Sequence, residues 1–302
     1  MKLRPPTVDD IPTIVGFLNT TSQACEGVDS SSEEEMRLWL TSPTNDPKEN
    51  VRLAYDADGL VGYADVDPRG SAPNRWWCEI EIDPTTDADA AGAALIAWAE
   101  QRAREQPGIL APYVSTANTT VKRLLEERDF RLVRHSYRME IDLGTELDEP
   151  EWREGIELRT IRAGRERRVW EVQEEIFEDS WAHTPTPYDE WLHWMHDNPS
   201  FDPTLWFLAY DGDELAAICL CRIHAREPDL GWVNILGTRR PWRRQGLGRA
   251  LLLHAFAVFR ERGFRRVGLG VDATSLTGAN RLYEKAGMRV VRQWDFYEKE
   301  LA

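Results

Sequence analysis

Apolar and polar residues alternate between strand-like and helix-like patterns along the whole chain. The apolar run Trp232 to Leu236 has the length of a strand, and Arg249 to Arg260 has helical periodicity. Arg266 to Val271 predicts another strand. A short helix follows it and ends at Gly287, the position of a C-cap. This part of the chain therefore predicts strands and helices in alternation.

The same pattern occurs twice in the sequence. Leu53 to Leu60 recurs as Leu208 to Leu215, a separation of 155 residues. Leu3-Arg4-Pro5 corresponds to Leu158-Arg159-Thr160 at the same separation. In both copies Tyr-Asp-x-Asp places turn residues between two apolar runs, as a hairpin requires. A repeat of this length indicates duplication of a whole domain.

We therefore predict two tandem domains, residues 1–143 and 156–302, joined by a linker at 144–155. The chain has 302 residues and is 42% hydrophobic, which is enough for two domains of ordinary size, each with its own core. Their charges differ. Residues 1–150 hold 15 Lys+Arg and 28 Asp+Glu, whereas 151–302 hold 22 and 24. Such an acidic half fits a scaffold, a wall that attracts cationic amines, or a solubilising surface.

The remaining composition excludes several classes of partner. Given the net charge of −15, we expect no nucleic-acid partner. No apolar run approaches the length of a membrane span, and Met1 to Pro6 leads directly into a predicted strand. We therefore expect a cytoplasmic protein with no membrane partner.

Cysteine and histidine usage predicts no metal site. The four cysteines are too few and too scattered for a disulfide framework, and Cys219 and Cys221 are predicted to pack as small hydrophobes on one face of a strand. His193 and His196 lie on a tryptophan-rich helical segment without an acidic partner at ligand spacing.

The most informative motif is Arg243-Arg244-Gln245-Gly246-Leu247-Gly248, between a predicted strand and a predicted helix. Its glycines let the backbone approach a bulky anion, and the new helix presents free N–H groups and the positive end of its dipole. Arginines also flank it at 239, 240 and 249. The motif predicts a pyrophosphate cradle. The alternative is that the glycines merely allow the turn.

The cradle motif, followed by Leu282-Tyr283-Glu284-Lys285-Ala286-Gly287-Met288, resembles the GNAT superfamily of acyl-CoA-dependent N-acetyltransferases. The resemblance implies an α/β (α+β) fold of two tandem GNAT-like domains, each a mixed, mostly antiparallel twisted sheet flanked by helices. It also implies acetyl-CoA as the cosubstrate. The cofactor-binding residues that it implies are Leu236, Gly237, Thr238, Arg243, Arg244, Gln245, Gly246, Leu247, Gly248 and Arg249.

The resemblance further implies that Tyr283 is the general acid. A positioned phenol can protonate the thiolate that leaves when an amine attacks a thioester. The alternative is a tyrosine that only packs its helix. The family often has an asparagine seven or eight residues earlier, where this chain has Leu276 and Ser275, so Ser275 replaces that cofactor contact only in part. Asn280 lies out of register for this role.

The first copy departs from the family pattern where chemistry is expected. Gly246 and Gly248 correspond to Ala90 and Gly92, and carboxylates replace the polar cradle residues. The further replacements are Asp87 for Arg243, Asp89 for Gln245, Leu125 for Tyr283 and Asp129 for Gly287. We expect the first domain not to catalyse acetyl transfer.

The acceptor site is expected at Val169 to Pro199, the least regular part of such domains. The aromatic and acidic residues there suit a protonated amine, although a tryptophan stripe at helical spacing is also typical of a core. They are Trp170, Trp181, Trp191, Trp194, Glu174, Glu175, Glu178, Asp179, His183 and Tyr188. Candidates for a general base, or for orienting a water, are His224, Asp229, Asp272, Asn234, Glu175 and Asp179.

The sequence therefore predicts an N-acetyltransferase that transfers acetyl from acetyl-CoA to a primary amine of a small molecule by direct attack. The amine is predicted to belong to an amino sugar, an aminoglycoside or a polyamine-like molecule. The tandem layout resembles the mycothiol synthase-like acetyltransferases. The alternatives are acetylation of a peptide or protein amine, and a non-catalytic acyl-CoA-binding module that engages a protein partner. The expected assembly is a monomer, with its domains as a pseudo-dimer, or a homodimer.

Overall fold

The chain forms two compact units. The computed structural model describes residues 1–67, 75–83, 88–198, 200–274 and 278–301. One unit comprises Met1–His135 and Gln293–Ala302, and the other comprises Ser136–Arg292. Among the described residues, no helix combines the length and apolarity needed to cross a membrane.

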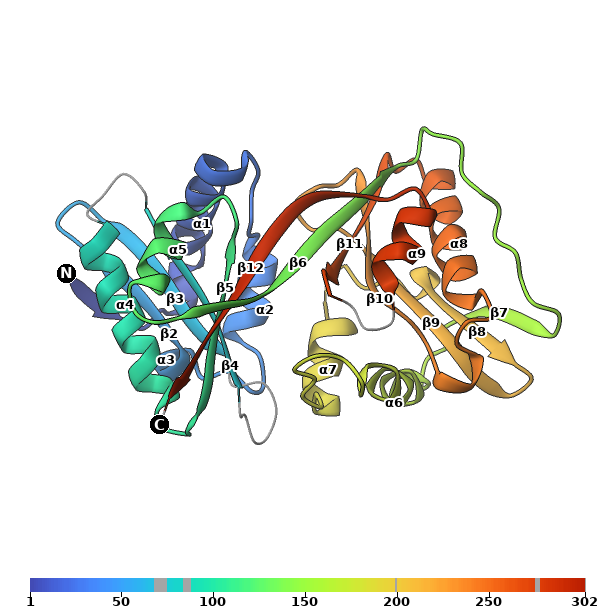
Figure 1. Ribbon diagram of the computed structural model, residues 1–302, viewed down its shortest axis with the longest axis horizontal. Coiled ribbons are helices and arrows are strands. Elements are labelled where there is room, and N and C mark those ends of the chain that lie inside the picture. The colour runs from blue at the N-terminus through green and yellow to red at the C-terminus, as the bar shows by residue number, and fades with distance from the viewer. Residues whose placement is uncertain (68–74, 84–87, 199, 275–277, 302) are drawn as a thin grey trace. The chain divides into compact units, whose positions relative to one another are not determined.

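The first unit is a mostly antiparallel sheet between two layers of helices (Figure 1). Its strands lie in the order β1-β2-β3-β4-β5-β12, and only the β4–β5 pair is parallel. Leu53 and Tyr63 pack against α1 and α2, whereas their neighbours Ala54 and Ala64 pack against α4. The strands are β1 (Lys2–Arg4), β2 (Val51–Tyr55), β3 (Leu60–Asp67), β4 (Arg75–Ile82), β5 (Gly108–Ser115) and β12 (Arg289–Leu301). The helices are α1 (Ile11–Glu26), α2 (Glu33–Leu40), α3 (Pro47–Asn50), α4 (Ala88–Ala103) and α5 (Thr119–Glu126).

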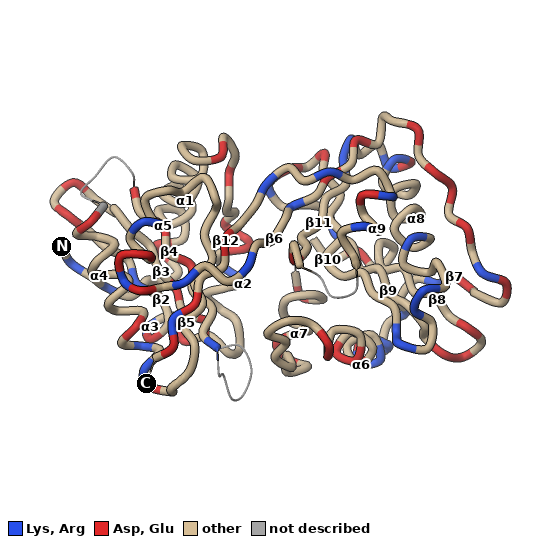
Figure 2. Tube along the Cα trace, in the orientation of Figure 1, with Lys and Arg blue, Asp and Glu red and all other residues tan. Residues whose placement is uncertain are grey.

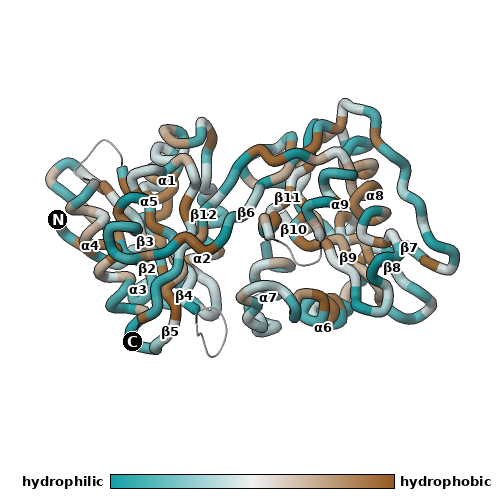
Figure 3. The backbone as a smooth tube through the Cα atoms, viewed as in Figure 1, coloured by the Kyte–Doolittle hydropathy of each residue, from teal (hydrophilic) through white to brown (hydrophobic). Residues whose placement is uncertain are grey.

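The second unit repeats this architecture, with strand order β6-β11-β10-β9-β8-β7 and only the β10–β11 pair parallel. Apolar segments run through its central strands and through the helices that cover them (Figure 3). The strands are β6 (Arg131–Asp142), β7 (Ile156–Thr160), β8 (Trp206–Asp211), β9 (Glu214–Ile223), β10 (Leu230–Thr238) and β11 (Arg266–Asp272). The helices are α6 (Glu166–Phe177), α7 (Tyr188–Met195), α8 (Leu247–Glu261) and α9 (Ala279–Lys285). The predicted mixed, mostly antiparallel fold is confirmed.

The two closing strands, β6 and β12, are exchanged between the sequence copies. Ser136–Asp142 of β6 pair with β11, although β6 follows the first copy's helix α5. Trp294–Leu301 of β12 pair with β5, although β12 follows α9 of the second copy. The units therefore divide within these strands and not at the predicted linker 144–155. Periodicity predicts that a strand exists, but it does not say which of two similar sheet edges the strand joins.

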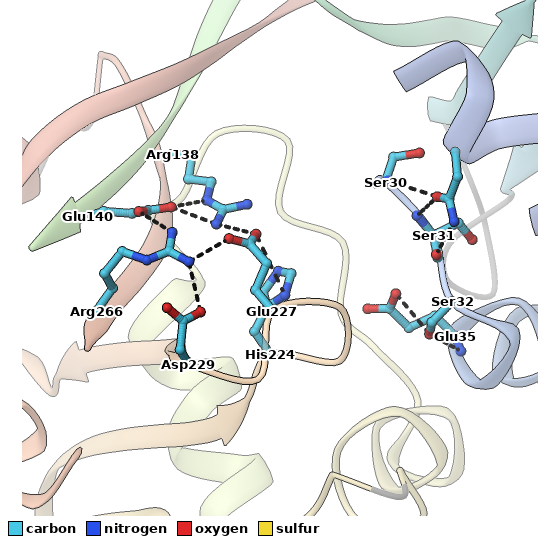
Figure 4. A network of polar contacts seen from close by, with 11 residues as sticks. Ser30, Ser31, Ser32, Glu35, Arg138, Glu140, His224, Glu227, Asp229 and Arg266 are labelled. Carbon is cyan, nitrogen blue, oxygen red and sulfur yellow. Dashed lines mark hydrogen bonds and ion pairs between the residues drawn. The ribbon is translucent and has the colours of Figure 1, made fainter. Parts of the chain in front are cut away.

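A charged network attaches β6 to the second unit (Figure 4). Arg138, only 4% exposed, donates to Glu140 at 2.7 Å and to Glu227 at 2.6 Å. Arg266 of β11 donates to Glu140 at 3.0 Å and also contacts Glu227 and Asp229. Because these charges are paired and hydrogen-bonded, Arg138 is accommodated in a largely buried position.

His224 lies beside this network and is 4% exposed. Burial lowers the pKa of His224 to about 3, and the nearby Arg226 and Arg138 lower it further. Glu227, 4.0 Å from His224 Nδ1, opposes this shift only in part. His224 is therefore neutral at physiological pH.

Acidification is expected to destabilise the protein through His224. The unfolded chain binds the proton near pH 6.5, whereas the folded protein binds it near pH 3, so the free energy of unfolding falls as the pH falls through this window. Between pH 7 and pH 5, urea unfolding should show a loss about 2 kcal/mol larger in the wild type than in His224→Gln. Equal losses in the two proteins would contradict the assigned protonation state.

Helix α6 packs so closely on β10 that a side chain at Gly237 is excluded. A Cβ at Gly237 would lie 2.3 Å from Cγ2 of buried Ile176. Gly237→Ala should therefore lower the free energy of unfolding by about 1–3 kcal/mol, measured in urea. Gly270→Ala is the matched control, because a Cβ there meets no atom within 4 Å. A similar stability in the two variants would disprove the close packing.

Candidate active site

The loop between β10 and α8 forms a cradle of backbone N–H groups. Gly246, the N-cap of α8, has φ 86° and ψ −10°, a left-handed conformation that glycine adopts without strain. No side chain caps this end, so the first N–H groups of α8, at Leu247 and Gly248, lack intrahelical partners. A Cβ at Gly246 would meet nothing within 4 Å. The cradle is thus open toward an anion.

The polar side chains predicted to bind the cofactor differ in whether other protein groups already pair with them. Arg243 is partly buried and donates hydrogen bonds to the carbonyls of Thr238 and Ile176, both 3.2 Å. Gln245 accepts a hydrogen bond from Arg153, and Arg249 forms an ion pair with Asp148. In contrast, Arg244 is exposed and forms no hydrogen bond or ion pair with any residue that the structure describes. Its guanidinium is available to a ligand.

Basic and acidic positions both mark the backbone around the end of α6 (Figure 2), and arginines before the cradle bind carboxylates there. Arg239 donates to Glu175 at 2.8 Å, and Arg240 pairs with Asp179 at 2.6 Å. The arginine side chains hold the pKa of Asp179 below its usual value. These contacts fix the loop, and they place the carboxylates of α6 in ion pairs.

Strand β10 separates from β11 just before the cradle. Pairing between the two strands ends at Val233 and Leu269, whereas β10 continues to pair with β9 as far as Thr238. The β9–β10 register shifts between Val233 and Ile235, the signature of a β-bulge. The edge of β10 beyond Val233, which contains the predicted residues Leu236, Gly237 and Thr238, therefore lacks a strand partner on the β11 side.

Tyr283 lies on α9, close to this opening. It is 8% exposed and packs in the same core as Leu247. Burial, followed by the nearby Cys219, raises the pKa of the Tyr283 phenol well above its usual value. None of the described residues forms a hydrogen bond with its hydroxyl. The phenol therefore stays protonated and has a proton to donate.

Helix α9 is held by contacts at both of its ends. Asn280 Nδ2 donates to the carbonyls of Asp272 and Ala273, at 3.0 and 2.8 Å, while its buried Oδ1 has no hydrogen-bond partner among the described residues. The predicted C-cap is found: Gly287 has φ 91°, and Met288 N–H bonds to the Tyr283 carbonyl at 3.0 Å. Ser275, the cofactor contact predicted before α9, lies outside the described residues. The sequence motif did not single out Asn280, whereas its buried Oδ1 marks it as a candidate ligand contact.

The first unit has different residues at the equivalent positions. Asp129 has φ 64°, like Gly287, and Phe130 N–H bonds to the Leu125 carbonyl, so buried Leu125 occupies the position of Tyr283. Asp89 pairs with Arg123. Strands β3 and β4 pair without a register shift, from Gly62 opposite Ile82 to Asp67 opposite Trp77. Asp87 lies outside the described residues.

The predicted general bases already have partners. His224 belongs to the charged network of β6, where its lowered pKa makes it a poor base at neutral pH, and Asp229 pairs with Arg266. Asp272 accepts hydrogen bonds from Thr274. Asn234 contacts Arg222 and the sulfur of Met195, at 3.1 and 3.5 Å. The structure does not bring these groups together as one catalytic cluster.

The region predicted to bind the acceptor is partly core. Trp191 is 2% exposed, stacks on Tyr188 and packs edge-to-face against Trp206. Glu174 lies 3.3 Å from His183, and burial raises the pKa of Glu174 despite this partner. The tryptophans thus build the layer under α6 and α7, while Glu174 and His183 form a pair without an arginine.

Cysteine and histidine contribute no metal cluster within the described residues. Cys219 and Cys221 are buried, with their sulfurs 3.5 Å apart, and burial raises the pKa of Cys221. They pack as small apolar residues in the core that contains Tyr283.

Comparison with known proteins agrees with this geometry. Residues 167–288 match the model of the acetyltransferase (GNAT) family. The mycothiol acetyltransferase of Thermobispora bispora is 31% identical over 240 residues, which are 78% of each chain. That of Geodermatophilus obscurus is 30% identical over 278 residues, 87% of this chain and 86% of the relative.

Solved structures show the same likeness. A GCN5-related N-acetyltransferase from Sphaerobacter thermophilus has a TM-score of 0.80 and 32% identity, covering 99% of this chain and 95% of that one. A tandem GNAT protein from the clavulanic acid biosynthesis pathway shares the fold, with a TM-score of 0.75 at 14% identity, over 100% of this chain and 98% of its own. The chain therefore belongs to the GNAT family and is an acetyltransferase.

Proposed function

We propose that the second unit transfers the acetyl group of acetyl-CoA to a primary amine of a small molecule by direct attack. One observation carries this proposal: the same unit contains, in chain order, an unpaired edge on β10, free N–H groups at the start of α8 and a protonated phenol on α9. Together they suit a diphosphate, an extended amide-containing arm and a leaving thiolate.

The residues present fit CoA. The N–H groups at the start of α8 and the free guanidinium of Arg244 offer hydrogen bonds and positive charge to a diphosphate. The β10 edge at Leu236 to Thr238 offers backbone groups to the amides of the pantetheine arm. The buried Oδ1 of Asn280 accepts no hydrogen bond from the described residues, and a bound ligand would supply a donor.

Tyr283 supplies the proton in this scheme. The amine, attacking as the neutral free base, forms a bond from its nitrogen to the thioester carbon. The carbon–sulfur bond breaks, the sulfur takes the electron pair, and the nitrogen releases one proton to water. A phenol with a raised pKa holds its proton until thiolate charge develops, and then donates it or shares it in a hydrogen bond. No covalent intermediate on the protein is required.

The acceptor is proposed to be an amino sugar or a related small amine. Support comes from the relatives named mycothiol acetyltransferase, which match this chain over most of its length. A non-catalytic CoA-binding module would not need a proton donor like Tyr283, which argues against that alternative. Turnover on small amines, but not on peptides, distinguishes the proposed class from protein acetylation.

The first unit is proposed to be a non-catalytic domain. It has buried Leu125 where the second unit has Tyr283, and Asp89 at the start of α4.

We place the protein in the cytoplasm, where acetyl-CoA is available. We propose that it acts as a monomer with two similar units, or as a homodimer.

Tyr283→Phe should lower kcat for acetyl transfer to glucosamine or a better small amine by about 100-fold or more, because the phenolic hydroxyl that donates the proton is lost while the ring remains. Thiol release measures the rate. Acetyl-CoA affinity, measured by calorimetry, should not change, and the melting temperature is the control for folding. An unchanged kcat would remove the role of Tyr283.

A negative charge at Gly246 should oppose binding of the diphosphate. Gly246→Asp and Gly246→Asn form a matched pair, since both residues tolerate left-handed backbone and differ mainly in charge. The Asp variant should bind CoA at least roughly tenfold more weakly than the Asn variant, and the difference should shrink with added salt. Equal affinities would exclude the cradle as the diphosphate site.

A further inference from the structure

Gly270 occupies an open position on β11. It is exposed, and a Cβ added to it would meet no heavy atom within 4 Å. Its cross-strand partner on one side is Arg138 of β6, whereas pairing on the β10 side has already ended at Leu269. Gly270 therefore lies where the two central strands separate.

The alternation of β11 shows which face Gly270 presents. Its neighbours Leu269 and Val271 point into the core that also contains Tyr283 and α8. Gly270 thus presents the opposite face, the same face as Gly268, where a Cβ would meet Trp232 and Glu140. The core side is filled with apolar side chains, so an acceptor amine has to reach the strand opening from the Gly270 side.

Nothing in folding explains a glycine at this position. A glycine inside a strand weakens the strand unless a positive φ or a close approach requires it. Gly231, Gly237 and Gly268 have such reasons, because a Cβ at each would lie within 3.0 Å of a neighbouring side chain. Gly270 has neither a left-handed φ nor a close neighbour. Its missing side chain therefore serves something other than packing.

The first unit gives an internal comparison. Cys78 and Val233 are equivalent, because Val66 and Cys221 are their partners on the preceding strands. Cys78 pairs with Pro112, and Val233 pairs with Leu269, so the next residue of each strand, Tyr113 or Gly270, occupies the same position. The Tyr113 hydroxyl donates to Glu79 at 3.1 Å, and its ring packs on Phe296. The unit without the tyrosine acid thus has a bulky aromatic where the second unit has none.

We propose that Gly270 is a specificity-determining residue for the acceptor, because it leaves the backbone of β11 bare where an unhindered primary amine of a small molecule approaches the thioester. This inference rests on the proposed acetyl transfer. It assigns the acceptor to the face of the second unit that carries Trp232 and Arg138, opposite to the core of α8 and Tyr283.

The test is a size series at this position: Gly270→Ala, Gly270→Ser and Gly270→Val. Each side chain enters open space, and a β-branched residue suits a strand, so the melting temperature should not fall. The KM for acetyl-CoA should stay within about twofold. With glucosamine or spermidine as acceptor, kcat/KM should fall progressively with side-chain size, by about 100-fold at valine. Gly16→Ala, at an open position in α1, is the surface control and should keep wild-type kinetics.

The outcomes separate the inference from the function on which it rests. Valine at position 270 with unchanged kcat/KM for both amines would overturn the role of Gly270, while acetyl transfer itself would stand. A wild type that binds acetyl-CoA but acetylates neither these amines nor cysteine amide would overturn both. If the Ala, Ser and Val variants lost acetyl-CoA affinity in step with amine turnover, Gly270 would belong to the cofactor site instead, and the proposal would fail.

Discussion

The separation of β10 from β11 beyond Val233 is the constraint on which the active site depends. Paired strands satisfy each other's backbone groups, so a pair that continued to Thr238 would leave no edge for a ligand. The bulge near Asn234 ends the pairing while the β9 side continues, and the sheet stays intact around the opening. The cradle at Gly246 follows within one short loop, and α9 packs at the start of α8. Each functional feature thus depends on a local change in one strand.

The two units share a fold but differ at the positions that the proposed chemistry uses. Both have the same strand order and the same parallel central pair, because their buried apolar faces specify it. In the first unit, however, the β3–β4 pair runs without a register shift, and Tyr113 stands where the second unit has Gly270. The cores hold both folds together, whereas the bulge, Gly270 and Tyr283, which the proposed chemistry uses, occur in the second unit.

Charge at the site is largely structural. The sequence places arginines densely around the cradle, and their number suggests a strongly positive anion site. In the structure, Arg239, Arg240 and Arg243 bind carboxylates or carbonyls of α6 and β10. Such pairing fixes the loop and the end of β10 relative to α6, and it leaves Arg244 for a ligand. Backbone N–H groups, rather than a cluster of guanidinium groups, therefore provide most of the cradle.

Sequence alone determined the local features of this protein. The repeated strand and helix order, the turn at Gly246 and the C-cap at Gly287 follow from local pattern, because backbone conformation and hydrophobic periodicity depend on neighbouring residues. Only the tertiary structure decided which sheet receives β6 and β12, which arginine stays free, that His224 is a buried neutral group, and that Gly270 lies at an open position. These properties depend on contacts between residues far apart in the chain, and two similar copies offer each strand two edges that the pattern cannot distinguish.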